Sequence, residues 1–128
     1  MLTNELKINH ISFDLWNTLI YPNPEYSLHR NQMLAELTDG GITVDEVKRR
    51  LVEAKSNIHQ IELATGVGYT AVQAWSTYFS GEKDCLTEND AIIREVLGSV
   101  KDLAIEHPPL MPDSIKQMLF SLTANGIS

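Results

Sequence analysis

The chain has 128 residues, of which 43% are hydrophobic and 21% are charged, a globular composition that excludes collagen-like, low-complexity and disordered classes. The formal net charge of −7 disfavours binding to nucleic acid and to an anionic membrane surface, because both carry negative charge. With a single cysteine, no secretory leader pattern and no apolar run of about 20 residues, we expect a cytoplasmic protein without a disulfide or a membrane span.

Residues 8–20 are the most strand-like part of the chain. Their hydrophobic residues are denser than simple alternation, as in a strand covered on both faces: Ile8, Ile11, Phe13, Leu15, Leu19 and Ile20. Pro22 and Pro24 then mark a linker. A single strand leaves its own backbone groups without partners. We therefore expect Ile8–Leu15 either to pair with another molecule or to be poorly ordered.

After this linker the hydrophobic spacing becomes helical. We predict a first helix that Gly40 and Gly41 end. A second helix carries the clearest period, with apolar residues spaced three and four apart: Val44, Val47, Leu51, Ala54, Ile58 and Ile61. Thr43 and Glu46 form a capping-box pattern at its start, and Gly66 ends it. We interpret the stripe as the core of a helical bundle.

Two further helices complete the predicted bundle, and a last helix follows a hinge. Thr70 and Gln73 give a second capping-box pattern, and Thr87 is predicted to cap the fourth helix. Three prolines within 108–112 mark a stiff hinge. After the last helix, Ile127 is typical of the first residue of a new strand. This order of elements is the opening of an α/β fold, so we expect either a fragment of a larger protein or a strand that pairs with another molecule.

The candidate site is the segment around Asp14. This carboxylate follows the predicted strand directly, at the edge where open α/β sheets bind ligands. A carboxylate there can act as a nucleophile or bind a metal ion. Thr18, four residues later, can turn its hydroxyl back into the same loop. The alternative is that Asp14 only caps a turn and Thr18 only caps a helix.

The run Asp14–Leu19 (Asp-Leu-Trp-Asn-Thr-Leu) resembles the first motif of the haloacid dehalogenase-like (HAD) hydrolase superfamily, Asp-x-aromatic-x-Thr-Leu. The resemblance implies an α/β parent fold with a Rossmann-like core. This chain would hold the first core strand and motif loop (1–24), a helical cap (25–107) and a hinge with a return helix (108–128). The chain itself would be mostly α-helical and truncated before the second motif.

The same resemblance implies a role for three residues. Asp14 would be the nucleophile that forms an aspartyl-enzyme intermediate, and would also contact Mg2+. Trp16 would give its backbone carbonyl to Mg2+, and Thr18 would order the loop. The implied reaction is Mg2+-dependent hydrolysis of a small-molecule substrate, by family base rate a small phosphate ester. Asn17 stands where many members carry glycine and receives no role.

The chain departs from the family pattern in two places. Phosphatases of the family carry an acid/base aspartate at the position of Trp16, and an indole cannot transfer that proton. An aromatic residue there is typical of 2-haloacid dehalogenases, which is the first alternative, although Arg30 does not match their characteristic arginine. The remaining motifs would lie beyond Ser128, so we expect this chain alone to be inactive. The other alternative is a non-catalytic helical module that dimerises through the unpaired strand or the cap helices.

The remaining chemistry-bearing residues give weaker patterns. No two histidines are spaced as metal ligands on one helix. The glycines at 66 and 68 do not lie between a strand and a helix, and the lone Cys85 has no activating neighbours. Within the bundle, the aromatic residues near Trp75 are interpreted as core, with one of them as a candidate contact for a substrate. The sequence does not identify the substrate.

Overall fold

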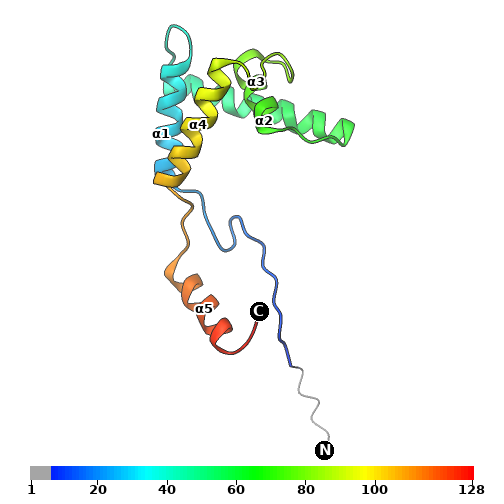
Figure 1. Cartoon of the computed structure of the whole chain (residues 1–128), viewed down its shortest axis with the longest axis vertical. Coiled ribbons are helices and arrows are strands. Elements are labelled where there is room, and N and C mark those ends of the chain that lie inside the picture. The colour runs from blue at the N-terminus through cyan, green and yellow to red at the C-terminus, as the bar shows by residue number, and fades with distance from the viewer. Residues whose placement is uncertain (1–6) are drawn as a thin grey trace, which may run out of the picture. The chain divides into compact units, whose positions relative to one another are not determined.

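The computed structural model describes residues 7–128 and divides the chain into two compact units. The helical unit is Pro24–His107, and the terminal unit consists of residues 7–23 and 108–128. Within the described residues there are five helices and no regular strand (Figure 1): α1 (Pro24–Leu37), α2 (Val44–Thr65), α3 (Ala71–Ser80), α4 (Ala91–Glu106) and α5 (Asp113–Ala124). The prediction of a mostly α-helical chain is therefore confirmed.

The helical unit is built on the contacts of α1 with α2 and α4, and of α3 with the same two helices. Figure 1 shows α1 and α4 side by side. Leu34 of α1, Val47 of α2 and Val96 of α4 are fully buried where these helices meet. Of the predicted stripe on α2, Val47 and Ala54 are buried, whereas Ile61 near its end is exposed. The first part of the stripe is therefore core, and the last part is surface.

The predicted capping boxes differ in outcome. At α3 the box is complete, because Gln73 N–H donates to the Thr70 hydroxyl while the Gln73 side chain accepts from Thr70 N–H. At α2 only half of it forms: Glu46 N–H donates to the Thr43 hydroxyl at 3.2 Å. The Glu46 carboxylate binds Arg49 instead, at 2.6 and 2.9 Å. A guanidinium one turn along the helix competes with the capping amide for the same oxygens, and here the charge-assisted pair prevails.

The prediction that Thr87 caps the fourth helix is wrong by three residues. α4 begins after the N-cap residue Asp90. Thr87 instead opens a turn in which its N–H donates to the Asp90 carboxylate at 2.7 Å, and its carbonyl accepts from Asp90 N–H at 3.0 Å. Both residue types favour N-caps and turns, so composition alone does not decide between them.

The predicted strand over Ile8–Leu15 does not form a regular strand in the part of the chain that the structure describes. The segment is mostly exposed and runs without helical turns (Figure 1). Apart from the turn bonds at Leu15, the backbone hydrogen bonds of this segment within the described residues join it to Ser128: Ile11 N–H donates to the Ser128 carbonyl, and Ser128 N–H donates to the Asn9 carbonyl, both at 3.0 Å. This is the hydrogen-bond pattern of a parallel pair, limited to one residue of the partner. A regular strand needs a longer partner.

α5 belongs to the terminal unit and contributes no fully buried residue. The side chains of Ile115, Met118, Leu119 and Leu122 are half-buried, as the predicted apolar face requires, whereas Phe120 is 75% exposed. None of the helices in residues 7–128 combines the length and the apolar character that a bilayer span requires.

Candidate functional site

The candidate site is the exposed loop that follows the extended N-terminal segment. The Thr18 hydroxyl donates a hydrogen bond of 3.0 Å to Asp14 Oδ2. Both residues are exposed, so the carboxylate is open to solvent and is not tied up inside the protein. The structure thus brings together the two residues that the sequence singled out for catalysis. Asp14 Oδ1 takes no part in this bond.

A tight turn of the backbone produces this approach. The Leu15 carbonyl accepts hydrogen bonds from the amides of Leu19 at 3.0 Å and Ile20 at 3.1 Å, with Thr18 N–H farther away at 3.4 Å. The Asn17 amide donates to the Ile20 carbonyl at 2.7 Å. These bonds fold the chain back directly after Leu15, so Thr18 comes within reach of Asp14.

Asn17 has a role in this turn that the sequence pattern did not assign. Its φ of +58° lies in the left-handed region, and no other non-glycine residue in the described part of the chain has a positive φ. Asparagine tolerates this region better than most residues, and glycine tolerates it best. The sequence carries a signal for this turn, because many proteins with the motif that residues 14–19 resemble have glycine at the position of Asn17.

The Trp16 carbonyl, unlike that of Leu15, accepts none of the hydrogen bonds of this turn. It pairs with Ile20 as an isolated parallel bridge, in which Leu15 and Ile20 supply the accepting carbonyls. The bridge therefore does not use the Trp16 carbonyl, which remains available as an oxygen ligand. The indole is 52% exposed. It can offer a flat apolar surface but no acid/base group.

Directly after the loop, the linker at residues 21–23 pairs with the hinge at residues 108–112. Tyr21 and Leu110 exchange two backbone hydrogen bonds of 2.8 Å as an isolated antiparallel bridge. One step further, Asn23 Nδ2 donates to the Pro108 carbonyl at 3.1 Å. These bonds hold the linker and the hinge together within the terminal unit, so the end of the loop at Ile20 is anchored.

A complete metal centre is not present among residues 7–128, since no three His, Cys, Asp or Glu side chains come close enough to hold an ion. His29 and His107 stack with ring centroids 4.8 Å apart. His10 lies 3.1 Å from the Ser12 hydroxyl and 3.4 Å from the Ser128 hydroxyl. Asp14 and the Trp16 carbonyl offer hard oxygen donors of the kind that Mg2+ prefers, so they fit part of a magnesium site.

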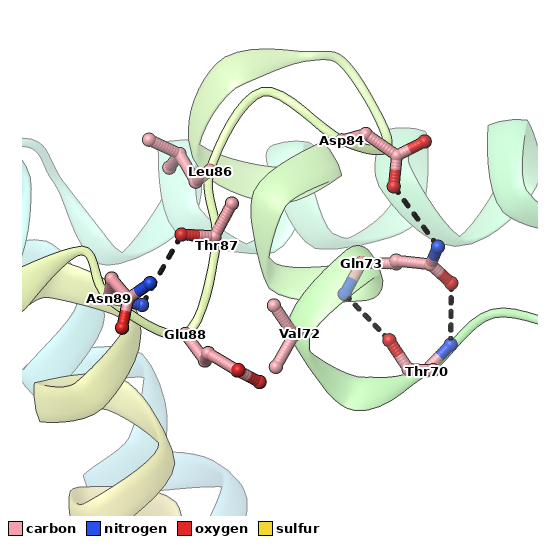
Figure 2. Close-up of a pocket in the computed structure, with 8 residues that line it drawn as sticks. All are labelled: Thr70, Val72, Gln73, Asp84, Leu86, Thr87, Glu88 and Asn89. Atoms are coloured by element: carbon pink, nitrogen blue, oxygen red, sulfur yellow. Dashed lines mark hydrogen bonds between the residues drawn. The ribbon is translucent and has the colours of Figure 1, made fainter.

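The helical unit carries a cavity of about 450 Å³, beside the start of α3 (Figure 2). Its polar walls are engaged with one another. The Gln73 amide donates to Asp84 Oδ1 at 3.1 Å and also completes the α3 capping box, and Thr87 accepts from Asn89 N–H at 3.3 Å. A ligand there would have to break these local bonds, so we assign it no function.

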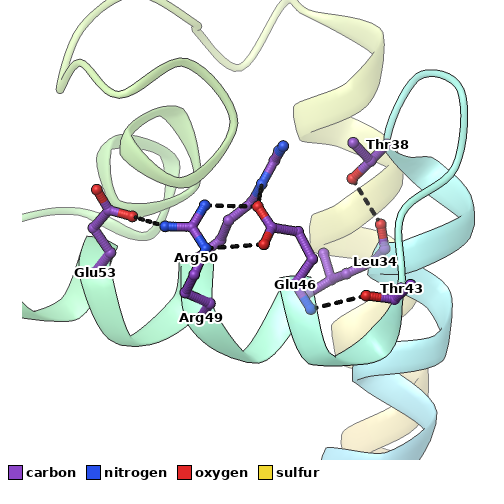
Figure 3. A network of polar contacts seen from close by, with 7 residues as sticks. All are labelled: Leu34, Thr38, Thr43, Glu46, Arg49, Arg50 and Glu53. Atoms are coloured by element: carbon purple, nitrogen blue, oxygen red, sulfur yellow. Dashed lines mark hydrogen bonds and ion pairs between the residues drawn. The ribbon is translucent and has the colours of Figure 1, made fainter.

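A network of charges runs along α2 (Figure 3). Arg49 binds Glu46 on one side and Glu53 on the other, at 2.6 and 2.8 Å, and Arg50 lies 3.3 Å from Glu46. The hydrogen bonds from Arg49 and then Arg50 lower the pKa of Glu46 to about 2. The arginines are thus neutralised by their own helix, and the network is a stabilising surface feature rather than an anion site.

No protein-family model matches the chain, and neither the curated proteins nor the solved structures contain a match. The resemblance to the HAD superfamily therefore depends on the motif residues Asp14–Leu19 alone.

Proposed function

We propose that the chain is the N-terminal part of a HAD-like hydrolase, with Asp14 as the nucleophile of a Mg2+-dependent hydrolysis of a small phosphate ester. The observation that carries the proposal is the loop itself. A solvent-exposed carboxylate ends an extended apolar segment, and a hydroxyl four residues later binds one of its oxygens at 3.0 Å. The hydrogen bond that Asp14 accepts comes from a hydroxyl, whereas a turn-capping carboxylate accepts from a backbone amide.

The pairing of the N-terminal segment supports an α/β parent. After α5, the chain returns to residues 9–11 and bonds to them in the parallel pattern, at Ser128. Extended segment, helix and parallel return are the parts of an α/β crossover unit. The carboxyl end of such a segment, where Asp14 lies, is the edge at which these sheets bind ligands.

The proposed chemistry needs two displacements at phosphorus. An oxygen of Asp14 attacks the phosphorus atom, the bond to the leaving alcohol oxygen breaks, and that oxygen takes up a proton from solvent water, to which the site is open. Water then attacks the phosphorus of the aspartyl phosphate, the bond to Asp14 breaks, and inorganic phosphate leaves. When bound, Mg2+ would offset the charge on the phosphoryl oxygens. Asp14 and the Trp16 carbonyl would be two of its ligands, and Thr18 fixes the rotation of the carboxylate.

Trp16 favours a second candidate, a 2-haloacid dehalogenase-like hydrolase. Attack at carbon releases a halide, which needs no proton, so the missing acid/base aspartate would not affect this first step. Water would then attack the ester carbonyl of Asp14, which restores the carboxylate and releases the 2-hydroxy acid. The Trp16 indole is 52% exposed, so it is open to contact with the carbon skeleton of a substrate. The test below separates the two by using both substrate types.

The third candidate is a non-catalytic helical module. The terminal unit exposes several large hydrophobic side chains that a partner could cover: Ile8, Phe13, Leu15, Trp16, Tyr21, Leu110 and Phe120. A second copy of the chain could supply that partner. In this case Asp14 would have no role in turnover.

The test uses the complete product of the gene that encodes these residues, with Mg2+ and either p-nitrophenyl phosphate or 2-chloropropionate. We expect release of phosphate or halide that Asp14→Asn reduces at least about 1,000-fold, because an amide is a poor nucleophile. Asp113→Asn is the matched control, since it removes an exposed carboxylate from the same unit. Equal turnover by wild type and Asp14→Asn would refute the nucleophile assignment, and a dimer without turnover would favour the module.

A further inference from the structure

We infer that Asn17 is a positioning residue for Asp14, acting through the Thr18 hydroxyl. The inference deepens the proposed function and depends on it for its catalytic readout. It starts from the backbone of Asn17, whose φ of +58° is the only positive value at a non-glycine residue within the described part of the chain. A conformation that most side chains avoid is retained at the centre of the candidate site.

The hydrogen bonds around Asn17 explain what this conformation achieves. Its amide donates to the Ile20 carbonyl at 2.7 Å, and the Leu15 carbonyl accepts from Leu19 and Ile20. The chain makes a tight loop from Trp16 through Asn17 to Ile20, and the residue that follows Asn17 directly is Thr18. The turn thereby delivers the Thr18 hydroxyl to within 3.0 Å of Asp14 Oδ2.

Packing does not provide a second means of holding these groups. Asp14, Asn17 and Thr18 are all exposed, so no buried neighbour restrains their side chains. The backbone turn is the constraint that keeps the Asp14–Thr18 bond formed. With Oδ2 held by this bond, Oδ1 is the oxygen left to react, and its direction is set by the turn.

The residue types allowed at position 17 follow from this geometry. Glycine and aspartate enter the left-handed region readily, whereas a β-branched residue resists it. Asn17→Gly should therefore keep the turn, and Asn17→Val should open it and release Thr18 from Asp14. The hydrogen bonds of this turn join backbone groups, so they do not require the Asn17 side chain.

The first test is structural and does not need turnover. In NMR spectra of the 128-residue chain, Asn17→Val should shift the Asp14 carboxyl carbon and the Ile20 amide, and Thr18→Val should shift the same Asp14 carbon. Asn17→Gly should leave the Asp14 carbon close to its wild-type position. An Asp14 carbon that Asn17→Val leaves unmoved would overturn the inference, whatever the protein's function.

The second test measures turnover in the complete gene product with the substrate that the wild type accepts. We expect Asn17→Val to lower kcat about 10–100-fold with KM changed less than about threefold, and Asn17→Gly to restore most of it. The double variant Asn17→Val, Thr18→Val should be no slower than the slower single variant. Both substitutions remove the same hydrogen bond, the one from the Thr18 hydroxyl to Asp14, so their effects should not add. Additive losses would overturn the inference.

These two tests also separate the failure of this inference from the failure of the proposed function. If Asp14→Asn abolishes turnover while Asn17→Val leaves kcat intact, the nucleophile stands and the positioning role is wrong. If the NMR shifts appear but no hydrolysis depends on Asp14, the turn is as described and the proposed function is wrong. Thermal unfolding of each variant identifies a kcat loss that merely reflects unfolding.

Discussion

Ser76 shows how a single hydroxyl organises a loop of the helical unit. It is fully buried on α3, donates to the Glu82 carbonyl at 2.7 Å and accepts from Leu86 N–H at 2.9 Å. Ser76→Ala would leave both backbone groups without this partner, so we expect a loss of about 1–3 kcal/mol in the free energy of unfolding. Urea denaturation would measure it. Ser56→Ala, at an exposed position on α2, is the control and should change stability by less than about 0.5 kcal/mol.

Glu46 should make stability depend on pH in the acidic range. Folding lowers its pKa from the ordinary value of 4.5 to about 2, first through hydrogen bonds from Arg49 and then from Arg50. A lowered carboxyl pKa stabilises the folded state above pH 4.5, and that contribution disappears as the pH falls from 4.5 towards about 2. Arg49 is exposed and Glu46 is half-buried, so solvent weakens the effect.

Urea denaturation of wild type and Glu46→Gln at a series of pH values tests this prediction. The wild type should be the more stable protein at pH 7, and the difference should vanish near pH 2. Glu95→Gln, an exposed carboxylate on α4, serves as the control for a general charge effect. A difference between wild type and Glu46→Gln that stays constant with pH would contradict the prediction.

At the scale of elements, two glycines should respond in opposite ways to alanine. Gly81 ends α3 with a φ of +82°, whereas Gly98 lies inside α4, and a Cβ at either position would meet nothing within 4 Å. Only the backbone preference differs. Gly81→Ala should therefore cost about 1–2 kcal/mol, and Gly98→Ala should add about 0.5–1 kcal/mol. Thermal melts of both variants test this, and a destabilising Gly98→Ala would contradict the assignment of α4 as a regular helix.

The helices were predictable because their signals are local. The Thr70–Gln73 box and Gly66 lie within one turn of the helix ends that they determine. Thr87 and Glu46 show the limit of such signals. Thr87 could cap a helix or open a turn, and its bond with Asp90 makes it part of a turn. The Glu46 carboxylate could bind the capping amide or Arg49, and it binds Arg49.

The strand was not predictable in the same way, because its hydrogen bonds depend on residues far away in the chain. Apolar density over Ile8–Leu15 favours a strand, but among the described residues its long-range backbone bonds reach only Ser128. The candidate site was predictable only in part. The sequence placed Asp14 and Thr18 in one loop, whereas the backbone turn at Asn17 that joins them became visible only in the structure.

At the scale of the whole molecule, the two units differ in how they are stabilised. All the fully buried hydrophobic side chains of the described residues belong to the helical unit, including Leu34, Val47 and Ile93. The terminal unit carries the candidate site but exposes much of its apolar surface, including Phe120 on α5. Under the proposed function, this surface packs against further strands of the parent sheet, which would also contribute the remaining catalytic groups.

The most direct measurement is to trap the aspartyl intermediate. The complete gene product is mixed with the phosphate ester and Mg2+, quenched in acid within one turnover and reduced with borohydride, which converts a phosphorylated aspartate to homoserine. Mass spectrometry of the peptide containing Asp14 then locates the change. We expect homoserine at position 14, dependent on both substrate and Mg2+. An unmodified Asp14 in a protein that hydrolyses the ester, or homoserine at another position, would contradict the nucleophile assignment.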